Sequence, residues 1–220
     1  MKIMTIDNPK LLKSVKKGWA SIGLMLAPSD LSGNNVCSKA TDICKRKCLF
    51  FTGRGRWGRT QDARIRRTNL LFEDPKTFWS HVRSDIEVEH DKNKHLCVRM
   101  NVLSDMPWER MKVSGTIKSI FELYPDIQFY DYTKVPKREI PDNYHLTFSL
   151  AEDNDRSAME EVWERKRNLS VVMLRNRRKF YGLSCIDGDK NDLRFLDPWP
   201  RIVRLTAKGD MKNDTGGFVR

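Results

Sequence analysis

The apolar run Ile22-Gly-Leu-Met-Leu-Ala27, followed by the turn-rich stretch Pro28-Ser-Asp-Leu-Ser-Gly-Asn-Asn35, sets the pattern from which we predict the fold. A short apolar run that ends in a cluster of turn residues is typical of a buried strand. Further strands are expected at 96–102, 127–132, 144–150, 170–174 and 202–207. Helices are expected at 60–72, from Asp74-Pro75 onward, from Ser114 to Tyr124, and at 155–167.

Strands that alternate with helices indicate βα units and parallel pairing, so the sequence predicts an α/β fold. The strand number is low for a complete eight-stranded barrel of about 250 residues. We therefore expect a partial or trimmed TIM-like (βα) barrel, with a doubly wound open sheet as the alternative. The chain has 220 residues and no linker-like stretch, which predicts a single domain over residues 1–220 with a cysteine-cluster loop at 37–48.

The formal net charge of +12 favours a polyanion such as nucleic acid as a partner, because neutralised phosphates release counterions. A basic surface that is only solvated is the alternative. No apolar run approaches the roughly 20 residues needed to cross a bilayer, and the first residues lack a signal-peptide segment. We expect a cytoplasmic protein with no membrane partner.

Three of the five cysteines lie in the segment Cys37-Ser-Lys-Ala-Thr-Asp-Ile-Cys44-Lys-Arg-Lys-Cys48. In a reducing compartment, clustered cysteines more often bind metal than form disulfides. A helical turn would place Cys44 and Cys48 on one face, and the turn residues before Cys37 would let it fold back toward them. The other two, Cys97 and Cys185, are expected to be buried core residues.

These three thiols are the predicted ligands of a metal cofactor. Neighbouring basic residues are expected to favour the thiolate form and to offset its charge; they are Lys39, Lys45, Arg46 and Lys47. Structural zinc commonly uses two cysteine pairs, and a second pair is missing from the sequence. An iron–sulfur cluster of the 4Fe-4S type, with one iron left open, is the favoured interpretation. Zinc with a distant fourth ligand and three buried cysteines without metal stay as alternatives.

A basic stretch with interleaved aromatic residues follows the cysteines. Arginines can grip phosphates while an aromatic ring stacks on bases, so we predict nucleic-acid contacts by Arg54, Arg56, Trp57 and Arg59. Arg64, Arg66 and Arg67 continue the stretch. The alternative is a solvated helical face on which the arginines only cover apolar surface.

Polar residues also follow two predicted strands, where barrel proteins place their functional groups. One set is Arg99, Asn101, Asp105 and Glu109, which are the candidate catalytic residues; the other is the segment Tyr130–Lys134. Asp105 and Glu109 suit an acid/base pair, although helix capping by Ser104 or Asp105 is a simpler account. The aspartates of 187–197 are interpreted as turn residues.

Many motifs in order resemble one known family. They are Leu26-Ala-Pro28, Ser32-Gly33, the cysteine triplet, Thr52–Gly55, Arg99–Asn101, Ser104-Asp105, Trp108-Glu109, Tyr130–Lys134, Asn143–Ser149, Asp192–Pro198 and the tail from Asp214 to Val219. The chain resembles the bacteriophage gene product 88 family of uncharacterised proteins from Lys17 to Val219. The resemblance implies a phage origin and residence in the cytoplasm of the infected bacterial host. It implies no biochemical function.

A more distant resemblance links the cysteine triplet to radical-SAM enzymes, in which three cysteines hold a cluster with an open iron. Their spacing has three and then two intervening residues, whereas this chain has six and three. No glycine-rich strand for S-adenosylmethionine can be matched either, so this cofactor gains no support from the sequence.

Two functions are therefore expected. The first is a phage iron–sulfur protein, a redox or radical-type enzyme acting on or near nucleic acid. The second is a non-enzymatic regulator that binds nucleic acid or a host protein, with iron–sulfur or zinc in a structural role.

Overall fold

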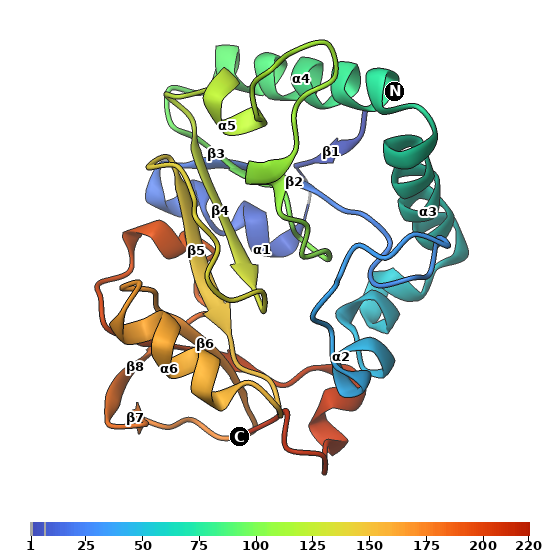
Figure 1. The fold of residues 1–220 in the computed structure, drawn as a ribbon. Coiled ribbons are helices and arrows are strands. Elements are labelled where there is room, and N and C mark those ends of the chain that lie inside the picture. The colour runs from blue at the N-terminus through green and yellow to red at the C-terminus, as the bar shows by residue number, and fades with distance from the viewer. Residues whose placement is uncertain (1, 7) are drawn as a thin grey trace.

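A computed structural model describes residues 2–6 and 8–220 and contains one open, nine-stranded sheet (Figure 1). The strand order is β1-β2-β3-β4-β5-β6-β9-β8-β7. Neighbours from β2 to β8 are parallel, whereas β1 and β7 pair antiparallel at the two edges. The strands are β1 (Met4–Thr5), β2 (Ala20–Leu24), β3 (Leu96–Arg99), β4 (Gln128–Thr133), β5 (Tyr144–Ser149), β6 (Leu169–Met173), β7 (Lys179–Phe180), β8 (Leu183–Asp187) and β9 (Ile202–Thr206).

Helices connect several of these strands. The α-helices are α1 (Pro9–Leu12), α2 (Asp42–Arg46), α3 (Gly58–Glu73), α4 (Pro75–Lys92), α5 (Ile120–Leu123) and α6 (Asp155–Trp163). Short 3-10 helices are η1 (Val15–Lys17), η2 (Leu49–Phe51), η3 (Gly53–Arg56), η4 (Trp108–Arg110), η5 (Arg194–Leu196) and η6 (Gly209–Asn213). Across the ranges that the structure describes, no helix has the length and apolar character to cross a membrane.

The predicted α/β class is confirmed, but a TIM-like barrel is not, because the sheet is not closed. Closure requires the first and last strands of the sheet to pair with each other. Here β1 and β7 form two separate edges. The βα repeat is also interrupted, since the described segment between β4 and β5 contains no helix.

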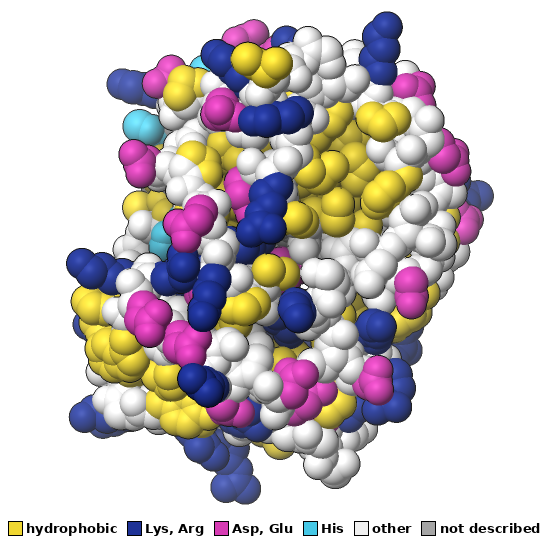
Figure 2. All heavy atoms as spheres, viewed as in Figure 1, with side chains coloured by type: hydrophobic (Ala, Val, Ile, Leu, Met, Phe, Trp, Pro, Cys, Tyr) yellow, Lys and Arg dark blue, Asp and Glu magenta, His cyan; other side chains and the backbone are white. Residues whose placement is uncertain are grey.

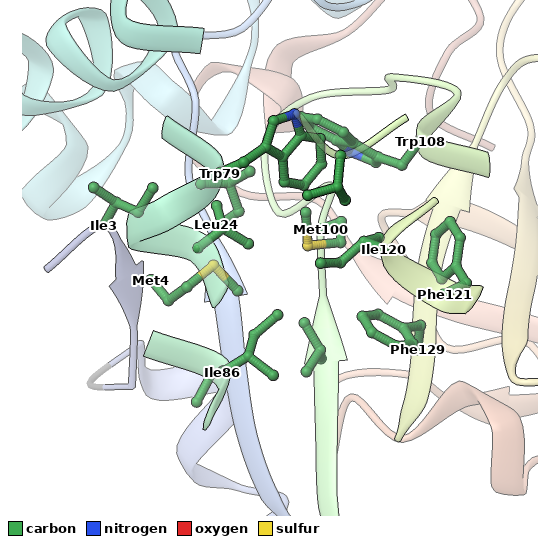
Figure 3. Packing of buried hydrophobic residues seen from close by; sticks show 14 of the residues in the cluster. Ile3, Met4, Leu24, Trp79, Ile86, Met100, Trp108, Ile120, Phe121 and Phe129 are labelled. Carbon is green, nitrogen blue, oxygen red and sulfur yellow. The ribbon is translucent and has the colours of Figure 1, made fainter. Parts of the chain in front are cut away.

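The larger apolar core lies between α4 and the first parallel strands. Phe78 and Trp79 of α4 face Trp108, with ring centroids 6.4 and 5.7 Å from it. Figure 3 shows Trp79 against Trp108, with Leu24 and Met100 beside them. A second cluster joins β5, β6 and β9 to α6. The first cluster thus covers β2 to β5 and the second covers β5, β6 and β9.

The helix starts show where local sequence signals work. Asp74 caps α4, since its carboxylate accepts a hydrogen bond of 3.0 Å from the Thr77 amide, and Pro75 begins the helix as expected. The predicted helix from Ser114 is wrong in its start. Ser119 is the cap, and it forms a capping box with Glu122 at the beginning of the short helix α5.

Three strands were not expected from the sequence: β1, β7 and β8. Cys185 lies on β8 and is half-buried, packed beside the second apolar cluster, whereas Cys97 on β3 is fully buried as predicted. The sequence does not predict β8, because this short strand lies among polar residues and shows no clear alternation of apolar and polar side chains.

Candidate functional site

A cavity of about 1050 Å³ lies at the carboxyl ends of the parallel strands. Crevices at this edge of a parallel sheet are the usual ligand sites of α/β proteins. Side chains at or just after five strand ends line it, namely Met25 after β2, Arg99 and Asn101 at β3, Tyr132, Thr133 and Lys134 at β4, Ser149 at β5, and Leu205 and Thr206 at β9. The sheet therefore brings together residues that are far apart in the chain.

All three clustered cysteines line this cavity and are half-buried. The Cys44 amide donates to the hydroxyl of Thr41, which caps α2. Cys48 lies beyond the end of α2, and its sulfur accepts a hydrogen bond of 3.5 Å from the Phe50 amide. The helical turn expected to carry both Cys44 and Cys48 is not present, because α2 ends at Arg46. Both cysteines nevertheless line the cavity.

Cys37 approaches the cavity from the loop that follows β2. Its amide donates to the side chain of Asn35 at 2.9 Å, and its thiol donates to the carbonyl of Leu103 at 3.7 Å. The turn residues before Cys37 therefore do what the sequence predicts, since they return the chain toward the other two cysteines.

The cysteine segment is fastened to the end of the chain. Lys47 forms an ion pair of 3.3 Å with Asp214, and Ile43 packs against the apolar cluster that contains Phe218. A Cβ at Gly216 would lie 2.2 Å from the Ile43 side chain, so glycine permits this close approach. In Figure 1, α2 lies next to the red C-terminal segment.

Lys134 follows β4 and stands among the thiols. Its amide donates to Asp105 at 2.8 Å, and its ammonium lies 5.4 Å from the centroid of the Phe218 ring. Burial opposes the charge of Lys134, but Cys44, Asp105 and Cys37 outweigh burial and raise its pKa above the ordinary value. Lys134 is therefore a fixed positive charge beside the three sulfurs, and its position after a strand is the signal that marks it in the sequence.

Cys37 and Cys48 favour the protonated form in the metal-free chain. Burial raises the pKa of Cys37 to about 11. Burial also raises the pKa of Cys48, although Lys134 and Arg64 act in the opposite direction. The expectation that the neighbouring basic residues would favour thiolates is thus wrong for these two cysteines, since burial dominates. A metal would have to displace their protons on binding.

Across the described residues, no three His, Cys, Asp or Glu side chains form a group that would hold a metal ion as they stand. This finding concerns a single ion. The thiolates of an iron–sulfur cluster bind different iron atoms, so its ligands stand farther apart than those of one ion.

Arg99 is buried in a network of acids at the cavity wall. It pairs with Asp192 at 2.9 Å and with Asp131 at 3.5 Å, and its guanidinium lies 4.9 Å from the Tyr132 ring. Burial raises the pKa of Asp131 to about 7, although Arg99 lowers it. The sequence reading assigned Asp192 to a turn and missed this pairing, because nothing local distinguishes a buried aspartate from a turn residue.

Asn101 also lines the cavity, but its side chain is occupied. Its carbonyl oxygen accepts hydrogen bonds from Ser104, from the Met106 amide and from the Trp108 indole, at 2.8, 2.9 and 2.9 Å. Its amide nitrogen donates to the Met106 carbonyl. Asn101 therefore holds the conformation of the loop after β3. Ser104 does not cap a helix here.

Asp105 and Glu109 have different positions although both contact Arg138. Asp105 lines the cavity and lies 3.4 Å from Arg138. Glu109 is not among the described lining residues, and its carboxylate accepts a hydrogen bond of 3.0 Å from Nε of Arg138. The structure thus brings Asp105, but not Glu109, to the cavity. No sequence signal pointed to Arg138.

The residues of the predicted nucleic-acid site are mostly exposed. Arg56, Trp57 and Arg59 lie on the surface, and Nε of Arg56 donates to the Phe51 carbonyl at 2.7 Å. The backbone of Arg54 is in η3, and its side chain lies outside the described part of the chain. Figure 2 shows Lys and Arg side chains spread over one face with Asp and Glu among them.

One arginine of the same stretch differs from these. Arg64 in α3 is buried and lines the cavity. Basic side chains outnumber acidic ones around the cavity as a whole. The basic ones are Lys13, Lys45, Arg46, Lys47, Arg64, Arg99, Lys134 and Lys208, and the acidic ones are Asp30, Asp105 and Asp189.

Comparison with known proteins gives one match. The model of a family described as Gene product 88 matches residues 2–220. No curated protein and no solved structure matches the chain. The distant resemblance to radical-SAM enzymes therefore finds no support in these comparisons.

Proposed function

The chain belongs to the Gene product 88 family, and from this premise we propose that it is a phage protein that holds an iron–sulfur cluster with Cys37, Cys44 and Cys48. The cluster would serve redox or radical-type chemistry on a ligand bound in the adjoining cavity. One observation carries the proposal: three thiols from separate turns of the chain line one ligand-sized cavity at the carboxyl ends of parallel strands.

The electrostatics around the thiols support a cluster. A cluster bound by three thiolates carries negative charge, and Lys134 supplies a positive charge beside the same three sulfurs. Three protein ligands on a 4Fe-4S cluster would leave one iron without a thiolate. That iron would supply an open coordination position for a ligand in the cavity.

The remaining candidate residues take distinct roles under this proposal. Arg99 and Asp105 line the cavity and would contact the substrate. Asn101 would hold the loop after β3, and Glu109 would position Arg138 beside Asp105. We propose nucleic-acid contacts by Arg54, Arg56, Trp57 and Arg59. The last three are exposed, and the stretch adjoins the cavity because Thr52 and Gly55 line it.

The test is anaerobic purification followed by iron and sulfide analysis. We expect both elements, with absorbance near about 400 nm from thiolate-bound iron. Serine at Cys37, Cys44 or Cys48 should reduce the iron content strongly. Cys185→Ser is the matched control, because Cys185 is half-buried but does not line the cavity. Absence of iron and sulfide from the wild-type protein, or equal loss in the control, would refute the proposal.

A second function is favoured by the fastening of the cysteine segment to the C-terminal segment through Lys47 and Asp214. A metal there, zinc or iron–sulfur, would stabilise this junction in a non-enzymatic protein that binds nucleic acid or a host protein. A colourless, zinc-containing protein would support this second function. So would unchanged nucleic-acid binding after Asp105→Asn, since a purely structural site does not use the Asp105 carboxylate.

A further inference from the structure

Among the residues that the structure describes, Arg64 is a buried cation without an acidic partner. The residue is 8% exposed, and its Nε and Nη1 atoms have no hydrogen-bond partner within that part of the chain. Its Nη2 atom makes only a weak contact of 3.9 Å with the sulfur of Met25. The charged groups that affect its pKa are Arg67 and Cys48, and burial lowers that pKa more than either of them.

The other buried arginines of the described chain do not share this property. Each forms an ion pair with a carboxylate: Arg99 with Asp192, Arg138 with Glu109, Arg167 with Glu161 and Arg194 with Asp197. Buried charges are normally paired, because desolvation is costly. The unpaired guanidinium of Arg64 therefore points to a partner that is not part of the polypeptide.

The surroundings of Arg64 fix the guanidinium at the cavity wall. Its central carbon lies 5.2 Å from the centroid of the Phe50 ring. A Cβ at Gly55 would lie 2.4 Å from the Phe50 carbonyl oxygen and 3.3 Å from Nη1 of Arg64. Glycine thus permits the backbone at residue 55 to pass close to the Phe50 carbonyl and to the guanidinium. Both Gly55 and Arg64 line the cavity that also contains the three thiols.

We infer that Arg64 binds an oxyanion group, a carboxylate or a phosphate, of the molecule that occupies the cavity. The planar guanidinium fork matches the two oxygens of such a group. Lys134, which lines the same cavity, adds positive charge. The inference rests on the proposed function only in taking this cavity as the ligand site; it does not require the metal.

The experiment is calorimetric titration of the purified protein with inorganic phosphate and, separately, with acetate. Iron and sulfide are measured in the same samples. The variants are Arg64→Met, which removes the charge, and Arg64→Lys, which keeps a charge but loses the fork. Arg66→Met is the matched control, because Arg66 is an exposed arginine of the same helix, α3.

We expect Arg64→Met to weaken binding of the preferred anion by about tenfold or more, as for loss of a hydrogen bond to a charged group. Arg64→Lys should give a smaller loss, and Arg66→Met should bind like the wild type. Preference for phosphate or for acetate identifies the source of the oxyanion. Thermal unfolding of each variant shows whether it is folded, and Arg64→Lys decides the result if Arg64→Met is not.

Three results would overturn the inference. The first is equal affinity of Arg64→Met and the wild type for the anion. The second is no binding of either anion to the wild type at millimolar concentration. The third is loss of iron and sulfide from Arg64→Met while its affinity for the anion is unchanged. The last result would make Arg64 the counter-charge of the cluster. A wild-type protein without iron that still binds the anion through Arg64 would refute the proposed function alone.

Discussion

Replacing Arg64 by methionine should stabilise the anion-free protein. Removing a buried charge relieves a desolvation cost of several kcal/mol, and an apolar replacement of similar length keeps most of the packing. The contact between Arg64 and the Phe50 ring is lost, at a cost of about 0.5–2 kcal/mol. We therefore expect the free energy of unfolding of Arg64→Met to exceed that of the wild type by about 1–3 kcal/mol.

The assay is urea unfolding followed by circular dichroism, in a buffer without phosphate or carboxylate. The exposed-residue variant Arg66→Met should lie within about 0.5 kcal/mol of the wild type. Adding phosphate at about one hundred times the wild-type dissociation constant should stabilise the wild type by about 2.7 kcal/mol, and Arg64→Met, whose affinity is weakened by about tenfold or more, by at most about 1.4 kcal/mol. The difference between the two proteins should then shrink or reverse.

The result that refutes this reasoning is destabilisation of Arg64→Met by 2 kcal/mol or more (an order-of-magnitude threshold, about the cost of breaking a satisfied buried interaction) in the anion-free buffer. Such a loss would mean that the guanidinium makes favourable polar contacts within the folded chain. A smaller stabilisation of Arg64→Met than of the wild type by the same phosphate concentration would support the inference that the anion acts through this side chain.

Three further predictions concern the fold. Glu109→Gln should lower the free energy of unfolding by about 1–3 kcal/mol, because buried Arg138 loses one charged partner and keeps Asp105 at 3.4 Å; urea unfolding measures the loss, and a change under 1 kcal/mol (about the value of an exposed pair) would contradict it. Ser119→Ala should cost about 1 kcal/mol as a lost helix cap, whereas Ser114→Ala should cost little; equal losses would argue against the observed helix start. Burial, together with the nearby cations Arg167 and Arg194, lowers the pKa of His145 from 6.5 to about 4. Between these two pH values the unfolded chain binds a proton that the folded chain does not, so the free energy of unfolding falls as the pH drops from 6.5 through 4. His145→Gln should remove up to about 3 kcal/mol of this loss between pH 7 and pH 4, and identical pH profiles would disprove it.

Local signals in the sequence were enough for several elements. The Asp74-Pro75 pair predicts the start of α4 because a cap and a first-turn proline act within one turn of helix. Apolar runs located β3, β4, β5, β6 and β9 to within a few residues. Functional groups commonly follow parallel strands, and this rule singled out Arg99, Asp105 and Lys134 in the sequence. All three line one cavity with the cysteines.

Features that depend on distant partners were not accessible in this way. Arg64 and Arg66 are alike in the sequence, and only the packing of α3 buries one and exposes the other. Asp192 becomes a partner of Arg99 through a contact between residues 93 positions apart. The barrel prediction failed for the same reason, since closure depends on how the two edge strands meet and not on any local pattern.

The two margins of the sheet have a consequence for association with other chains. Each ends in a strand of two residues, β1 and β7. An incoming strand from a second molecule could pair along only two residues at either margin, which is too short a ladder to compete with water, and at β1 the Met4 amide already donates to Asp85 at 2.8 Å. The short edge strands thereby protect this open sheet from pairing edge to edge with other molecules, the process by which other open sheets form fibres.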